Sequence, residues 1–160
     1  MDRFKKILVA ASPGHLEPLT LRTAANLADA NRAHLTVLDV VAPLPPWRKK
    51  MNVEGRIVDV EAALLQDREE RLRHMVQNTR GAKATEVMVT VGEPFLEVIR
   101  HVFARGHDLV MVGESEVDTA ALPQPSSGVM HLLRKCPAPV WVMHPSLVEE
   151  LRILALVDPD

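Results

Sequence analysis

The chain has 160 residues, of which 47% are apolar and 25% are charged, as expected for one compact globular domain with a sizeable core. The formal net charge is -2 and there is no Tyr, so neither a basic face nor an aromatic stacking platform for nucleic acid is indicated. The single cysteine, Cys136, excludes an intramolecular disulfide framework. Without a signal peptide pattern or an apolar run long enough to span a membrane, we expect a cytoplasmic protein.

Apolar patterning predicts strands that alternate with helices. Short apolar runs are typical of strands buried on both faces, and apolar residues at helical spacing indicate helices. In chain order we expect a strand at 7–11, a helix at 17–30, a strand at 35–41, an extended proline-rich connection at 43–47, a helix at 53–79, a strand at 85–91, a helix at 94–105, a strand at 108–113, a helix at 126–135 and a strand at 137–143. This order predicts right-handed crossovers and a parallel sheet with helices on both faces.

Two helices have a clearly predicted buried side. The long helix is expected to bury Ile57, Val60, Leu64, Leu72, Met75 and Val76. The next helix begins at Pro94, is expected to stop at Gly106, and is expected to bury Phe95, Val98, Ile99, Val102 and Phe103.

The end of the chain resembles its beginning. Residues 153–160 read ILALVDPD, and residues 7–14 read ILVAASPG. We therefore expect one domain over residues 1–146, followed at 147–160 by a linker and the start of a truncated second repeat. A chance apolar tail that docks on the surface is the alternative.

The most informative segment is residues 107–143. It predicts a buried strand, a glycine, a long polar loop, a serine-capped helix and a second buried strand, which is the layout of a phosphate-binding edge of a parallel sheet. The loop, however, carries Glu114, Glu116 and Asp118 where such a site would favour glycine.

Five segments together resemble the universal stress protein family: KKILVAAS, AHLTVLDVV, GEPFLEVIRHV, GHDLVMVG and SSGVMHLLRKCPAPVWVM. They span Lys5 to Met143, and the last one looks most like the amino-terminal domain of tandem members of the universal stress protein E type. The resemblance implies an α/β fold: a doubly wound, Rossmann-like sheet of five parallel strands, of the adenine-nucleotide alpha hydrolase-like kind. It also implies homodimerisation, or intramolecular pairing with a second domain, through the last strand, at Val140, Trp141, Val142 and Met143.

ATP-binding members of this family carry the motif G-x2-G-x9-G-[ST], in which glycines let backbone N–H groups approach the phosphates. Gly113 and Ser127 match the first and last positions, whereas Glu116 and Ser126 replace the second and third glycines. The resemblance further implies that Val40 meets adenine through its backbone. Ser12 stands where the family has an aspartate that positions the nucleoside.

These departures lead to two hypotheses. A carboxylate about 4 Å from a phosphate charge costs roughly 4 kcal/mol at an effective dielectric constant of about 20. We therefore expect a stress-response binding or signalling module with a degenerate nucleotide site and no resident cofactor, which is not an enzyme and acts through dimer or partner contacts. The alternative is an ATP-binding switch with slow hydrolysis, in which Mg²⁺ bridges Glu116 and the phosphates. A structural half that only scaffolds a partner domain also stays open.

Other kinds of site are less well supported. The seven histidines form no cluster at ligand spacing, so no metal is expected. Cys136 is expected to be a small buried thiol, and Asp39 a buried acid without an evident partner. A phosphorelay receiver is excluded, because Ser12, Gly92 and His144 occupy the places of its essential acids and lysine.

Overall fold

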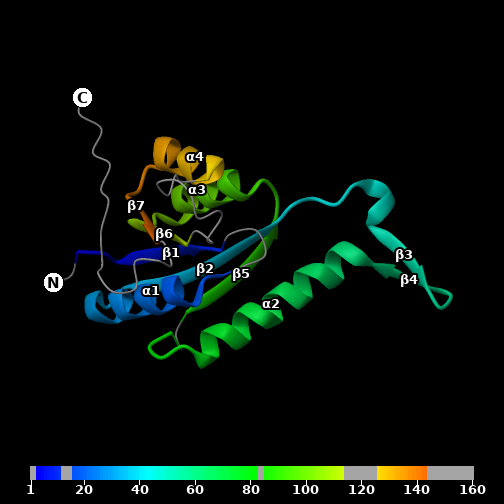
Figure 1. Cartoon of the computed structure of the whole chain (residues 1–160), viewed down its shortest axis with the longest axis horizontal. Coiled ribbons are helices and arrows are strands. Elements are labelled where there is room, and N and C mark those ends of the chain that lie inside the picture. Colours follow the sequence, from blue (N-terminus) through cyan, green and yellow to red (C-terminus); the bar gives the residue numbers. More distant parts are fainter. Residues whose placement is uncertain (1–2, 12–15, 83–84, 114–125, 144–160) are drawn as a thin grey trace, which may run out of the picture.

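The computed structural model describes residues 3–11, 16–82, 85–113 and 126–143 (Figure 1). Five strands form the main sheet: β1 (Lys6–Ala10), β2 (His34–Val41), β5 (Glu86–Val91), β6 (Leu109–Gly113) and β7 (Val140–Met143). The helices are α1 (Pro18–Asn31), α2 (Val60–Asn78), α3 (Pro94–Arg105) and α4 (Ser127–Lys135). A short 3-10 helix, η1 (Pro46–Arg48), precedes a hairpin of β3 (Lys50–Val53) and β4 (Arg56–Asp59).

The main sheet has the strand order β5-β2-β1-β6-β7, and all its pairs are parallel. The chain runs outward from β1 through β2 to β5, and then crosses to the other side of β1 to form β6 and β7. This reversal makes the sheet doubly wound and places the point of reversal at the centre. The predicted α/β fold class is therefore confirmed.

Helices cover both faces of the sheet. Successive side chains of a strand point to opposite faces, so a single strand contributes to the core on each side. Ile7 and Val9 of β1 pack in one core cluster with residues of α1 and α2. Leu8 and Ala10 of the same strand pack in a second cluster with residues of α3 and α4. Figure 1 shows the same arrangement, with α1 and α2 on one side and α3 and α4 on the other.

The prediction that a single helix spans residues 53–79 is wrong at its beginning. Residues 53–59 belong to the β3–β4 hairpin, because Glu54 (φ 50°) and Gly55 (φ 81°) are both left-handed, as a two-residue type I′ turn requires. The helix begins at Val60, and the Asp59 side chain caps it by accepting the Ala62 N–H at 3.0 Å. Ile57 therefore lies on the hairpin, where it is 76% exposed, and not on a buried helix face.

Other details also differ from the predicted elements. Of the remaining residues expected on the buried side of α2, Leu72 and Val76 are buried and Met75 packs against the core, whereas Val60 and Leu64 are only half-buried. The connection expected to be extended over residues 43–47 ends in the 3-10 helix η1.

The buried side of α3 is narrower than predicted, because it does not include Phe103. Val98 and Val102 are buried, but Phe103 is 69% exposed. Phe103 lies eight residues beyond Phe95, and at about 100° per residue this rotates it by roughly 80° around the helix, away from the sheet.

No described helix combines the length and the apolar content needed to cross a membrane.

Candidate functional site

Two of the predicted site residues, Val40 and Gly113, lie on strands that end at the same edge of the sheet. Ala10 of β1 lies between Leu38 of β2 and Val112 of β6 in the strand register. Val40 is two residues beyond this level and Gly113 is one residue beyond it, so parallel pairing brings both to the carboxyl edge. Val40 is buried, which is compatible with a role for its backbone alone.

Of the other four predicted site residues, two lie in the described part of the chain and two lie outside it. Ser126 is the N-cap of α4 and Ser127 is the first helical residue, and both are exposed. Ser12 and Glu116 lie outside the described residues, as do the remaining acids of the loop, Glu114 and Asp118.

Gly113 is closely covered by the first turn of α1. A Cβ atom placed on Gly113 would lie 2.6 Å from Thr20 Oγ1 and 2.8 Å from Glu17 Cβ. No other residue type fits there unless α1 moves. Packing between α1 and β6 thus accounts for this glycine, whether or not a phosphate binds beside it.

At the amino terminus of α4, the side chain of the capping residue already bonds to one backbone N–H group of the first turn. The Oγ atom of Ser126 accepts the Val129 N–H at 3.4 Å. A phosphate at a helix N-terminus would use N–H groups of this first turn. Because a glycine at position 126 would leave the Val129 N–H without this bond, the Ser126 substitution changes the donors that the helix offers.

Gly128, two positions after the place of the third motif glycine, also has a packing role. A Cβ atom on Gly128 would lie 1.6 Å from Cζ of Phe95. The glycine lets the ring of Phe95 in α3 lie directly against the backbone of α4.

The structure corrects the expectation that Asp39 has no partner. Asp39 lies on β2, 2% exposed, and Nη1 of Arg68 from α2 lies 3.2 Å from its Oδ2 atom. Its Oδ1 atom has no hydrogen-bond partner among the described residues. Burial raises the pKa of Asp39, and the Arg68 guanidinium opposes that rise. The sequence did not reveal this pair, because Arg68 stands in a run of charged residues, 67–71, of the kind that usually faces solvent.

The structure also describes the other residues considered for chemistry. Cys136 is half-buried, and burial raises the pKa of its thiol, which disfavours the reactive thiolate. His107 is buried and its Nδ1 lies 3.3 Å from the carbonyl oxygen of His101. Within the described ranges, no group of three or more His, Cys, Asp or Glu side chains could hold a metal ion.

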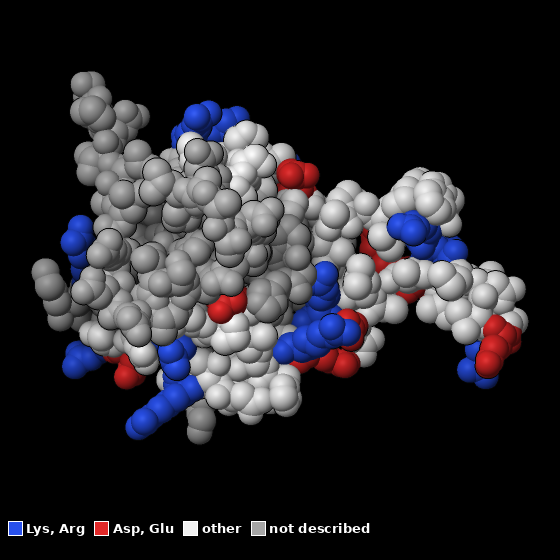
Figure 2. Space-filling model, viewed as in Figure 1, with Lys and Arg blue, Asp and Glu red and all other residues white. Residues whose placement is uncertain are grey.

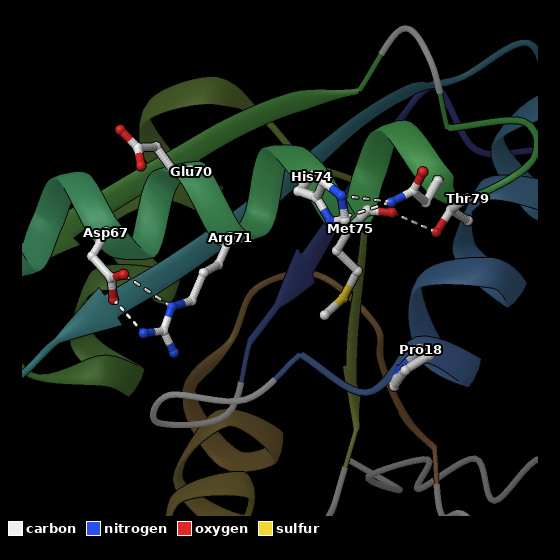
Figure 3. A pocket seen from close by; sticks show the side chains of 8 residues that line it. Pro18, Asp67, Glu70, Arg71, His74, Met75 and Thr79 are labelled. Carbon is white, nitrogen blue, oxygen red and sulfur yellow. Dashed lines mark hydrogen bonds and ion pairs between the residues drawn. The ribbon is translucent and has the colours of Figure 1, made fainter.

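An open groove of about 690 Å³ lies elsewhere, between α2 and the start of α1 (Figure 3). Its lining includes Pro18 of α1 and Asp67, Arg71 and His74 of α2. Asp67 and Arg71 pair with each other at 3.0 Å, and the carboxylate of Glu70, which also lines the groove, accepts a hydrogen bond from the uncharged amide of Gln66 at 3.0 Å. None of the described residues of the predicted nucleotide site lines it.

The sequence matches the universal stress protein family over residues 3–144. Among solved structures, the universal stress protein UspA from Lactobacillus plantarum is similar with a TM-score of 0.63 and 22% identity, covering 88% of this chain and 98% of that one. A universal stress protein in complex with cAMP has a TM-score of 0.54 and 19% identity, covering 88% and 98%. The universal stress protein from Archaeoglobus fulgidus in complex with dAMP has a TM-score of 0.51 and 16% identity, covering 89% and 98%. No curated protein matches the chain significantly. On its sequence match, this chain belongs to the universal stress protein family.

Proposed function

We propose that this chain is a stress-response binding or signalling module of the cytoplasm whose nucleotide site is degenerate, and that it acts through contacts with a partner and not through catalysis. The observation that carries the proposal is the cover over Gly113. Side-chain atoms of Glu17 and Thr20 lie against this glycine, next to the backbone that the family motif offers to a phosphate.

Charge and hydrogen bonding support the same proposal. Glu17 is an acid at this edge of the sheet, and Glu116 replaces a motif glycine in the adjoining loop. Each carboxylate near a phosphate opposes binding by up to roughly 4 kcal/mol if it lies about 4 Å away at an effective dielectric constant of about 20. The Ser126 cap further reduces the N–H groups that α4 can donate.

The proposed partner contact uses the edge of the sheet. β7 is an outermost strand, and Val140, Trp141, Val142 and Met143 are all partly exposed. An edge strand with apolar side chains is a template for pairing with another chain. We propose that it pairs either with β7 of a second copy or with a second domain of the kind expected after residue 146.

A nucleotide-binding switch is the second candidate, because two structurally similar proteins were solved with cAMP and with dAMP. Here the backbone at Val40 would meet adenine, and ATP would bind with Mg²⁺ held partly by Glu116. In the first proposal Glu116 weakens ATP binding, whereas in the second it strengthens ATP binding by holding Mg²⁺.

Titration with fluorescent ATP, with and without Mg²⁺, tests both proposals. For a degenerate site, the wild-type protein should show no saturable binding at millimolar nucleotide. The double variant Glu116→Gly/Ser126→Gly restores both motif glycines and should gain about 10- to 1000-fold in affinity. For a Mg²⁺-assisted switch, the wild-type protein should bind in the micromolar range, and Glu116→Gly should weaken binding only when Mg²⁺ is present.

Glu93→Gln is the matched control. Glu93 is an exposed acid at the same edge of the sheet, and its side chain makes no capping hydrogen bond to α3. Its loss should leave the affinity for ATP unchanged. Micromolar binding by the wild-type protein, or ATP hydrolysis during the titration, would contradict the degenerate-site proposal.

A further inference from the structure

The β3–β4 hairpin is an arm that projects from the domain. It extends beyond the start of α2, away from the five-stranded sheet (Figure 1). Figure 2 shows that the arm carries acidic and basic side chains with uncharged surface between them. The two strands form a sheet of their own with no third strand among the described residues. An isolated two-stranded hairpin is only marginally stable in water, so a partner would stabilise this arm.

The pairing register divides the side chains of the arm between two faces. Met51 lies opposite Val58, and Val53 lies opposite Arg56. Residues directly opposite each other in an antiparallel pair project to the same face. Met51, Val53 and Val58 therefore share one face, where Met51 is 57% exposed and Val53 is 47% exposed.

The same register shows which backbone groups of β3 point outward. The Val60 N–H donates to the Lys49 carbonyl at 2.9 Å, so residues 49 and 60 form a hydrogen-bonded pair. Such pairs alternate with non-hydrogen-bonded pairs along an antiparallel ladder. Lys50 and Asn52 consequently direct their backbone N–H and C=O groups away from β4, toward the free edge of β3.

We propose that this edge pairs with β3 of a second copy of the chain, antiparallel and about a two-fold axis at Asn52. In this register the outward backbone groups of Asn52 in the two copies bond to each other. Met51 of each copy lies opposite Val53 of the other, and Lys50 of each copy lies next to the turn residue Glu54 of the other. The strand is thus complementary to itself in hydrogen bonding and apolar contact, and with the adjoining turn also in charge, as an isologous interface requires.

Neither the other edge of the arm nor a membrane fits as well. A pairing through β4 that sets Ile57 opposite Ile57 would place Arg56 opposite Val58, without complementary charge. The turn at the end of the arm presents Glu54, a carboxylate where an arm inserted in a lipid surface would need an apolar or basic residue.

The test uses two charge reversals in the full chain, Lys50→Glu and Glu54→Lys. Each variant makes both ends of the proposed interface alike in charge, so its self-association should weaken by at least about tenfold. An equimolar mixture of the two variants restores both opposite-charge pairs. Sedimentation velocity and native mass spectrometry should therefore show weakened assembly for each variant alone and mixed assemblies of one copy of each after combination.

Arg80→Glu is the control, because Arg80 is exposed and lies outside the arm. This variant should associate like the wild-type protein and should not pair preferentially with Glu54→Lys. The proposal is overturned if the wild-type protein is monomeric at high micromolar concentration, or if the charge reversals leave association unchanged. The proposed register would also be overturned if each variant alone associates more weakly and an equimolar mixture of the two does not recover the association. All these outcomes are independent of nucleotide binding, and a dimer formed through β7 alone would be insensitive to both reversals.

Discussion

The aromatic ring of Phe95 in α3 lies directly against the backbone of Gly128 in α4, so closely that a Cβ atom on Gly128 would lie 1.6 Å from Cζ of the ring. This contact joins the two helices that cover one face of the sheet. It also holds in place the first turn of α4, which follows the loop that carries Glu116, the residue in the place of the second motif glycine. The position of this turn therefore depends on a glycine that is not one of the motif glycines.

Gly128→Ala should lower the free energy of unfolding by about 1–3 kcal/mol, because the ring or the helix must move. Urea denaturation measures the change. Ser127→Ala, at the neighbouring exposed position, should change stability by less than about 0.5 kcal/mol. The double variant Phe95→Leu/Gly128→Ala removes the ring and should cost less than the sum of the single changes. Additive costs would show that the contact does not set the helix position.

Removing the partner of the buried Asp39 should also destabilise the fold. Arg68→Met leaves the carboxylate buried without its 3.2 Å ion pair, at a cost of about 3 kcal/mol at neutral pH. The double variant Asp39→Asn/Arg68→Met should recover most of this loss. Arg73→Met is the control, because Arg73 forms an exposed ion pair on the same helix with Glu69, and such a pair contributes at most about 0.5 kcal/mol.

The stability of the Arg68→Met variant should depend on pH in a defined direction. Burial already raises the pKa of Asp39 above 3.8 in the folded protein, and loss of the guanidinium raises it further. The folded state then takes up a proton before the unfolded state does, so the deficit of the variant should shrink as the pH falls from the folded pKa toward 3.8. A deficit that grows in this range would contradict the assignment.

His107 should make the protein less stable in mild acid. Burial lowers its pKa below 6.5, the hydrogen bond to the His101 carbonyl opposes this, and the positive charges of Arg105 and Lys6 add to the lowering. The unfolded chain therefore binds the proton first, and stability is lost as the pH falls through about 6.5 toward the lower folded pKa. His107→Asn keeps an amide donor for the His101 carbonyl and should flatten this dependence, as measured by denaturation between about pH 7.5 and 5. An unchanged slope would exclude His107 as its origin.

Replacing the left-handed residue at the end of α1 should stabilise the protein. Arg32 has φ 52° and ψ 39°, and its N–H bonds to the carbonyl groups of Ala28 and Asp29. Glycine adopts this conformation without the Cβ penalty, so Arg32→Gly should raise the free energy of unfolding by about 0.5–1 kcal/mol. Ala30→Gly, two residues earlier within the helix, should lower it by about 1 kcal/mol. The same sign for both variants in thermal denaturation would refute this explanation.

The sequence by itself determined the main sheet and the limits of several helices. Runs such as residues 7–11 are buried on both faces, and local chemistry marks the ends of α3, because Pro94 suits a first helical turn and Gly106 is left-handed at its end. These features depend on residues within a few positions of each other. The hairpin was missed because Glu54-Gly55 is a weaker turn signal than Asn-Gly, and because the apolar residues around it also fit a helical period.

Only the tertiary structure decided which residues of the candidate site meet and what surrounds them. The turn of α1 over Gly113, the ring of Phe95 against Gly128 and the ion pair of Arg68 with Asp39 all join segments that are distant in sequence. Their formation depends on the rotation of each helix about its axis and on its distance from the sheet. Those two quantities are set by the packing of the whole core, so local sequence patterns do not contain them.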